Sequence, residues 1–146
     1  MTNRSVLPLA AMVGAASLWT GPALADDWGI TMPSGNIMCT RDPGEGGNPS
    51  VIRCDLLQMP AGAPPAPKDC KLLWGDSFKI TYAGKIGERL CHDASDTTRN
   101  DHSATLPYGS VWKEGGFTCT SRTTGLTCVN PLGHGFAISR EVQRVF

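Results

Sequence analysis

Residues 115–130 read GGFTCTSRTTGLTCVN and carry the strongest indication of the fold. Apolar and polar side chains alternate on both sides of a short polar segment, which is typical of two antiparallel β-strands joined by a tight turn. Placing Cys119 opposite Cys128 leaves residues 122–125 as an even-length loop, in which Gly125 can supply a positive φ. Directly opposed side chains point to the same face of a hairpin, so this register predicts a disulfide between the two cysteines.

An earlier part of the chain repeats this pattern. The segment GNIMCTR, residues 35–41, echoes GGFTCTSR, and a second cysteine follows it in VIRCDL. By analogy we expect Cys39 to pair with Cys54 across the looser loop DPGEGGNP, which leaves Cys70 to pair with Cys91. A metal site is a weaker interpretation of these cysteines, because structural zinc sites usually use close pairs such as C-x-x-C and none occurs here.

The rest of the chain contains short alternating runs and no stretch with helical periodicity. Clear alternation covers residues 77–82, 116–120 and 135–140, and Gly, Pro, Asn and Asp occupy the gaps. We therefore predict an all-β fold, a small antiparallel sandwich or barrel of about eight to ten short strands cross-linked by three disulfides.

Two stretches differ from this pattern. Residues 59–67, MPAGAPPAP, are too rich in proline for a sheet and should form an extended connector that ends at Cys70. Residues 92–102, HDASDTTRNDH, are polar and acidic and should form a solvated loop. Their oxygen atoms could bind calcium, but the spacing lacks the central glycine and the closing glutamate of an EF-hand loop.

The N-terminus has the three parts of a secretory signal peptide. Arg4 precedes an apolar run over residues 6–18, which is too short to span a bilayer, and Ala23-Leu24-Ala25 offers small residues for cleavage. We expect residues 1–25 to be removed after Ala25, and residues 26–146 to form a single domain. That domain should be secreted or periplasmic, with no membrane anchor.

Charge excludes some partners. The chain has 13 basic and 13 acidic residues, and no segment is strongly basic. Binding to nucleic acid or to anionic lipid is therefore not expected.

Several motifs together resemble a known family. They are SGNIMC near the start of the predicted domain, PAPKDCKLLWG in its middle, and LPYG, GGFTCTSRTTGLTCVN and GHGFAISR in its last third. With these motifs, residues 28–145 resemble a family of small exported bacterial proteins that is described only as a domain of unknown function. The resemblance implies an exported protein with this cysteine framework, and it implies no reaction, substrate or cofactor.

Candidate functional residues lie mainly in the last third of the chain. His134 lies between two glycines and could act as an acid, a base or a ligand, or could simply form a turn. Arg140 could bind a carboxylate or phosphate, or pair with a surface acid. Tyr108, Trp112 and Phe136 could contact a sugar or a partner protein, although core packing is the more ordinary use of such side chains.

No catalytic motif supports an enzyme. There is no G-x-S-x-G, no H-E-x-x-H and no phosphate-binding glycine loop, and all six cysteines are assigned to disulfides. The sequence favours a non-enzymatic module, without a cofactor or metal, that binds a protein or glycan outside the cytoplasm. The alternatives are a small secreted hydrolase, for example nuclease-like, that uses His134 with Arg140, and a purely structural component of the envelope.

Overall fold

The computed structural model describes residues 28–58, 62–96 and 103–146. In these residues eleven strands form two sheets, and a 3-10 turn, η1 (Ala94–Asp96), is the one helical element. The predicted all-β class is confirmed. The strands outnumber the eight to ten expected because the chain also forms very short strands that alternation cannot reveal.

The first sheet has six strands in the order β5-β4-β3-β2-β1-β6. These strands are β1 (Gly29–Thr31), β2 (Ile37–Asp42), β3 (Val51–Leu56), β4 (Leu73–Thr81), β5 (Glu88–His92) and β6 (Ala104–Thr105). Adjacent strands of this sheet are antiparallel, except that β6 runs parallel to β1. A purely antiparallel sheet is therefore wrong at this edge, because the chain leaves β5 at one edge and returns beside β1 at the other.

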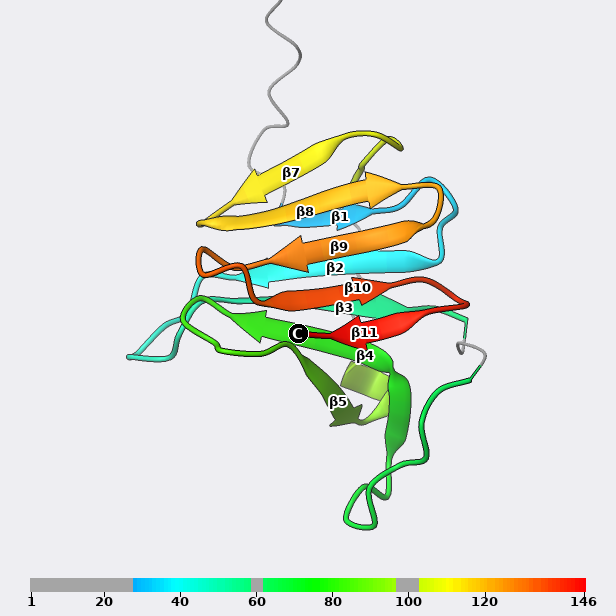
Figure 1. The fold of residues 1–146 in the computed structure, drawn as a ribbon. Helices are drawn as coiled ribbons and strands as arrows, with labels where there is room; N and C mark the ends of the chain where they lie inside the picture. The colour runs from blue at the N-terminus through cyan, green and yellow to red at the C-terminus, as the bar shows by residue number, and fades with distance from the viewer. Residues whose placement is uncertain (1–27, 59–61, 97–102) are drawn as a thin grey trace, which may run out of the picture.

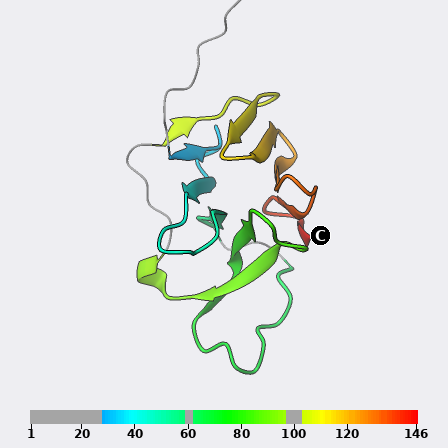
Figure 2. The same ribbon diagram turned by 90° about the vertical axis from the view of Figure 1, so that its left-hand side faces the viewer.

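The second sheet has five antiparallel strands in the order β11-β10-β9-β8-β7. They are β7 (Val111–Glu114), β8 (Phe117–Arg122), β9 (Gly125–Val129), β10 (Gly135–Ile138) and β11 (Gln143–Val145). In Figure 1 this sheet lies in front of the first one, and Figure 2 shows the two layers side by side. The architecture is a β-sandwich.

The core fills the space between the sheets. Alternation along β8 turns Phe117, Cys119 and Ser121 inward, and the same alternation along β3 turns Ile52 and Cys54 inward. Aromatic side chains meet across the core, where the ring centroids of Phe78 and Phe136 lie 5.9 Å apart. One buried cluster of apolar residues thus joins both sheets.

Both predicted hairpins are present with the predicted register. Cys119 lies opposite Cys128, and Cys39 lies opposite Cys54, and each pair forms a disulfide. Pairing in the second hairpin continues to Arg122 and Gly125, so its turn is shorter than the predicted loop. Gly125 has a φ of 135°, the positive value that the sequence indicates.

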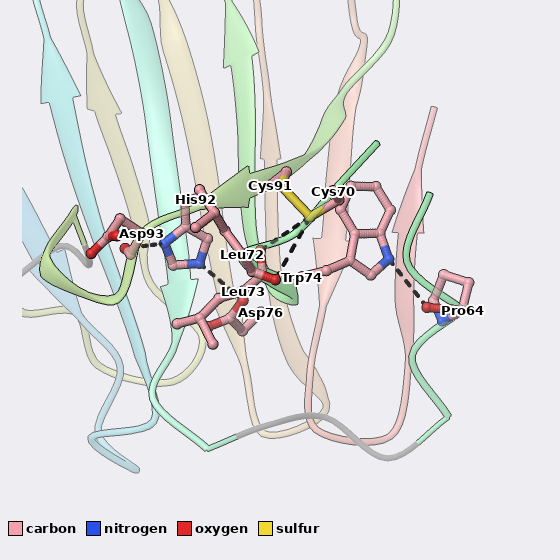
Figure 3. Close-up of a disulfide and its surroundings, with 9 residues drawn as sticks. All are labelled: Pro64, Cys70, Leu72, Leu73, Trp74, Asp76, Cys91, His92 and Asp93. Carbon is pink, nitrogen blue, oxygen red and sulfur yellow. Dashed lines mark hydrogen bonds and ion pairs between the residues drawn. A yellow bond between two sulfur atoms is a disulfide. The ribbon is translucent and has the colours of Figure 1, made fainter. Parts of the chain in front are cut away.

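The third disulfide, Cys70–Cys91, connects the proline-rich connector to β5. Residues 62–67 contain no strand, as predicted, and the indole Nε1 of Trp74 donates a hydrogen bond of 3.1 Å to the carbonyl oxygen of Pro64. Figure 3 shows this indole beside the disulfide. Residues 59–61 of the predicted connector lie outside the described residues.

At one end of the sandwich, hydrogen bonds join turns of the two sheets. The Asn130 side chain donates to the carbonyl oxygens of Thr81, at 3.1 Å, and of Gly84, at 2.7 Å. Its Oδ1 accepts hydrogen bonds from the backbone N–H groups of Leu132 and His134. Asn130 is buried, so one amide side chain connects the β4–β5 turn with the β9–β10 turn.

The predicted signal peptide, residues 1–25, lies outside the described residues. Within the described part of the chain, no helix has the length and apolar character needed to cross a membrane.

Candidate functional site

At the opposite end of the sandwich, five segments from both sheets surround an open cavity of about 350 Å³. The segments are the β1–β2 turn, the residues that follow β3, the β6–β7 segment, the β8–β9 turn and the β10–β11 turn. We call this cavity the loop-end pocket. Asn36, Gln58, Tyr108, Arg122, Arg140 and Glu141 are among its lining residues.

Tyr108 and Arg122 line adjacent parts of the pocket wall. Tyr108 lies in a tight turn in which Ser110 N donates to the carbonyl oxygen of Pro107, and Gly109 has a φ of 84°. Two backbone hydrogen bonds join this turn to the end of β8: Gly109 N donates to Ser121 O, and Ser121 N donates to Ser110 O. Tyr108 is 42% exposed, so this turn presents an accessible tyrosine in the pocket that Arg122 also lines.

Arg140 lies in the β10–β11 turn, which Ser139 shapes. Ser139 Oγ accepts hydrogen bonds from the backbone N–H groups of Glu141 and Val142, at 3.2 and 3.0 Å. The predicted strand 135–140 therefore ends at Ile138, because Ser139 starts a turn. This turn places Arg140 on the pocket.

A short chain of hydrogen bonds crosses the pocket from the first sheet to the second. Gln58 N donates to Asn36 Oδ1 at 2.9 Å, and Arg140 Nη1 donates to Gln58 Oε1 at 3.1 Å. The amide of Gln58 is neutral, so it orients the guanidinium of Arg140 without neutralising its charge.

Two arginines outside the pocket, Arg41 and Arg53, are paired with carboxylates, and Arg89 and Arg144 lie over aromatic rings. Arg41 is paired with Glu114, and Arg53 is paired with Asp55 and Asp96. In the described structure, no carboxylate lies within ion-pair distance of Arg122 or Arg140. Both guanidinium groups therefore keep donors for a ligand.

These features together favour binding of a polar ligand that carries negative charge. Guanidinium groups bind carboxylate and phosphate oxygens in bidentate geometry, and an exposed tyrosine ring offers a flat surface. Glu141 contributes one negative charge to the rim, so the pocket residues Arg122, Arg140 and Glu141 carry a formal net charge of plus one.

Two of the predicted contact residues are core residues. Trp112 is 5% exposed and Phe136 is fully buried, because they pair directly with Cys119 and Cys128 and share the inward face of the sheet with them. Their burial favours the core-packing interpretation, and neither side chain lines the loop-end pocket.

His134 and Arg140 do not share a site. His134 precedes β10 and lies in the turn that Asn130 organises, whereas Arg140 follows the other end of β10. Tyr108 and Arg140 line the same pocket, and His134 does not. The structure therefore does not bring His134 and Arg140 together in this pocket.

A second polar cluster lies on β4 and β5, where the sequence predicted a solvated loop from His92 onward. His92 is instead 4% exposed, with Nε2 3.0 Å from Asp76 Oδ1 and Nδ1 2.9 Å from the carbonyl oxygen of Asp93 (Figure 3). Arg53 Nη2 lies 3.3 Å from the same Nδ1, so His92 joins β3, β4 and the residue that follows β5. Residues 97–102 of the predicted loop lie outside the described residues.

Arg53 borders this cluster. Burial alone would lower its pKa, but the hydrogen bond to Asp96 and the charge of Asp55 outweigh burial and raise it. Arg89 shows the opposite balance, since burial lowers the pKa of its guanidinium, which lies over the ring of Phe78. These arginines thus serve the packing of β3, β4 and β5.

Two carboxylates of the predicted acidic loop, Asp93 and Asp96, have partners within the chain. Hydrogen bonds from the backbone N–H and the hydroxyl of Ser95 lower the pKa of Asp93. Asp96 pairs with Arg53. Among the described residues, the sulfur atoms of Cys39, Cys54 and Cys128 also lie within 4.8 Å of one another, but all three belong to disulfides.

Sequence reasoning missed Arg122, Asn36 and Gln58. Arg122 had a signal, because the repeated hairpin pattern ends in arginine in both copies, at Arg41 and Arg122. The contribution of Asn36 and Gln58 depends on how the two sheets face each other, which local patterns do not reveal.

The fold and the pocket define a small disulfide-linked β-sandwich with a ligand-sized cavity at one end, and the three disulfides indicate an oxidising location outside the cytoplasm. The chain belongs to DUF6636, a family of unknown function whose model matches residues 9–146. No curated protein and no solved structure matches the chain.

Proposed function

We propose that this protein is exported by its N-terminal signal peptide and acts as a non-enzymatic binding module in the envelope or outside the cell. The loop-end pocket is its binding site. One observation carries the proposal: turns from both sheets converge on a cavity that is lined by an exposed tyrosine and by two arginines, with no carboxylate in ion-pair distance of either arginine among the described residues.

The pocket has the size and the rigidity of a ligand site. A volume of about 350 Å³ lies within the range of small-molecule sites, and concave polar cavities suit a small polar ligand better than a flat protein surface. The surrounding turns are held by hydrogen bonds and by strands whose register is fixed. Fixed turns lower the conformational entropy that binding would otherwise cost.

Export is the second part of the proposal. Six cysteines joined in three disulfides suit an oxidising compartment, and residues 1–25 have the composition of a signal peptide. Fractionation followed by N-terminal sequencing tests this part. The exported protein should begin at Asp26, and material that begins at Met1 in the periplasm or medium would contradict it.

Ligand binding is tested by calorimetry on the exported protein with libraries of glycans and peptides. Replacing Tyr108 with Ala or Arg140 with Gln should weaken binding and leave the melting temperature nearly unchanged, because both side chains are exposed. Arg144→Gln is the matched control, since Arg144 is exposed, lies over the ring of Phe146 and does not line the pocket. If the affinity for a ligand is unchanged in the Tyr108 and Arg140 variants but falls in the Arg144 variant, that ligand binds outside the loop-end pocket.

A further inference from the structure

We propose that the ligand of the loop-end pocket is an acidic sugar, a saccharide unit that carries a carboxylate. This inference rests on the proposed binding function and names the chemistry that the site recognises. It is carried by three groups among the lining residues: a pair of cations, an exposed aromatic residue and several neutral hydrogen-bonding side chains. The rest of the lining is formed by Met32, Ile37, Gly125, Ser139 and Glu141.

The cationic part is formed by Arg122 and Arg140, one from each of two turns of the second sheet. A carboxylate between them would receive charge-assisted hydrogen bonds from a guanidinium fork, whose planar geometry matches its two oxygen atoms. Gln58 already holds one nitrogen of Arg140 at 3.1 Å, which restricts the side chain before a ligand arrives.

The aromatic part is Tyr108. The residue is 42% exposed and lines the pocket, and two backbone hydrogen bonds fix the turn that carries it to β8. The apolar face of a sugar ring can pack against a tyrosine ring, while the hydroxyl groups of the sugar stay in contact with polar groups.

The neutral part consists of Ser34, Asn36, Gln58 and Thr123. Hydroxyl and amide side chains both donate and accept hydrogen bonds, so they suit the many hydroxyl groups of a saccharide. Met32 and Ile37 are the two aliphatic side chains in the lining, whereas the core of a peptide or protein interface usually buries a larger apolar area. The lining therefore favours an acidic saccharide over a peptide carboxylate.

The test compares ligands that differ only in the carboxylate. Calorimetry on the exported protein would use oligosaccharides of uronic acids and the same oligosaccharides with their carboxyl groups converted to methyl esters. We expect the acids to bind roughly 10- to 100-fold more tightly than the esters, the range that corresponds to losing one hydrogen bond to a charged group. Arg122→Gln and Arg140→Gln should each reduce this preference, whereas Arg144→Gln should not.

Tyr108→Ala separates this inference from the proposed function. The variant should weaken acid and ester alike, because stacking does not depend on the carboxylate. If acid and ester bind with equal affinity, and Tyr108→Ala abolishes the binding of both, the acidic-sugar inference is wrong. The proposed binding function would still be supported by that result. Binding of carboxylate peptides with no binding of any saccharide would also overturn the ligand class. Absence of any ligand for the pocket in both libraries would contradict the proposed function as well.

Discussion

The sulfur atoms of Cys54 and Cys128 lie 3.9 Å apart, although they belong to different disulfides in facing sheets. Cys54 is bonded to Cys39 in the first sheet, and Cys128 is bonded to Cys119 in the second. All four cysteines are at most 1% exposed. Two of the three disulfides therefore pack against each other in the core.

The disulfides should differ in their accessibility to reductant. The attacking thiolate must reach a sulfur atom, and Cys91 is exposed while Cys70 is half-buried. We expect limiting reductant at neutral pH to open Cys70–Cys91 first. Alkylation followed by peptide mapping measures this order, and early labelling of Cys119 or Cys128 would contradict it.

Removing individual disulfides should separate loop closure from packing. Replacing Cys70 and Cys91 with Ser should cost about 3 kcal/mol in the free energy of unfolding, as expected from a loop of that length. The Cys119–Cys128 disulfide closes a shorter loop, so its loss costs less in loop entropy. Replacing both cysteines with Ala, however, also leaves a gap beside Cys54. Urea unfolding should therefore show at least as large a loss for the buried pair, and a clearly smaller loss would contradict tight packing there.

Asn130 should be among the most sensitive polar positions. Asn130→Ala removes hydrogen bonds to two backbone carbonyls and two backbone N–H groups, each worth about 1 kcal/mol. Asn130→Asp should destabilise the fold to a similar degree at neutral pH, because it places a carboxylate against the carbonyl oxygens of Thr81 and Gly84. Asn48→Ala, at an exposed loop position, is the control in chemical denaturation. If Asn130→Asp leaves the free energy of unfolding nearly unchanged, the hydrogen bonds that the Asn130 side chain donates contribute little to stability.

Arg53 should contribute far more to stability than its exposed partner. Asp55 is fully buried, and Arg53 Nε lies 3.2 Å from its Oδ1. Arg53→Met removes one charged hydrogen-bond partner of this buried carboxylate and should cost about 1.5 to 3 kcal/mol. Asp96 is 67% exposed, so Asp96→Asn should cost less than about 1 kcal/mol. Equal effects in urea unfolding would disagree with this division.

The carboxyl group of Asp93 should titrate at low pH. Hydrogen bonds from Ser95 lower the pKa of Asp93 in the folded protein. The ionised Asp93 therefore stabilises the fold at pH values above its pKa in the unfolded chain, about 3.9. This contribution is lost as the pH falls through the lower pKa that Asp93 has in the folded protein. Ser95→Ala should raise the pKa of Asp93 in an NMR titration, whereas Ser34→Ala should leave it unchanged. An unchanged value in the Ser95 variant would assign the shift to another cause.

The two hairpins could be predicted because their signals are local, and the Cys70–Cys91 disulfide followed because these two cysteines remained. Alternation fixes which side chains share a face, and Gly125 marks the turn between Cys119 and Cys128. The same rule could have placed Phe136 in the core, since it lies directly opposite Cys128 in the next strand.

The pocket could be predicted only in part. Tyr108 and Arg140 were identified from residue type, but their meeting with Gln58 depends on how the two sheets pack. The separation of His134 from Arg140 has a local cause. Ser139 ends β10 with a turn, so the two residues lie beyond opposite ends of one strand.

The separation between the disulfide-linked core and the loop-end pocket has a practical consequence. The pocket is lined by turns, whereas the buried disulfides join strands, so pocket residues can change while the core sequence stays constant. The domain is thus suited to serve as a scaffold for selected libraries. Randomising positions 34, 108, 122, 123 and 140 in a displayed library should give new ligand specificities on an unchanged framework.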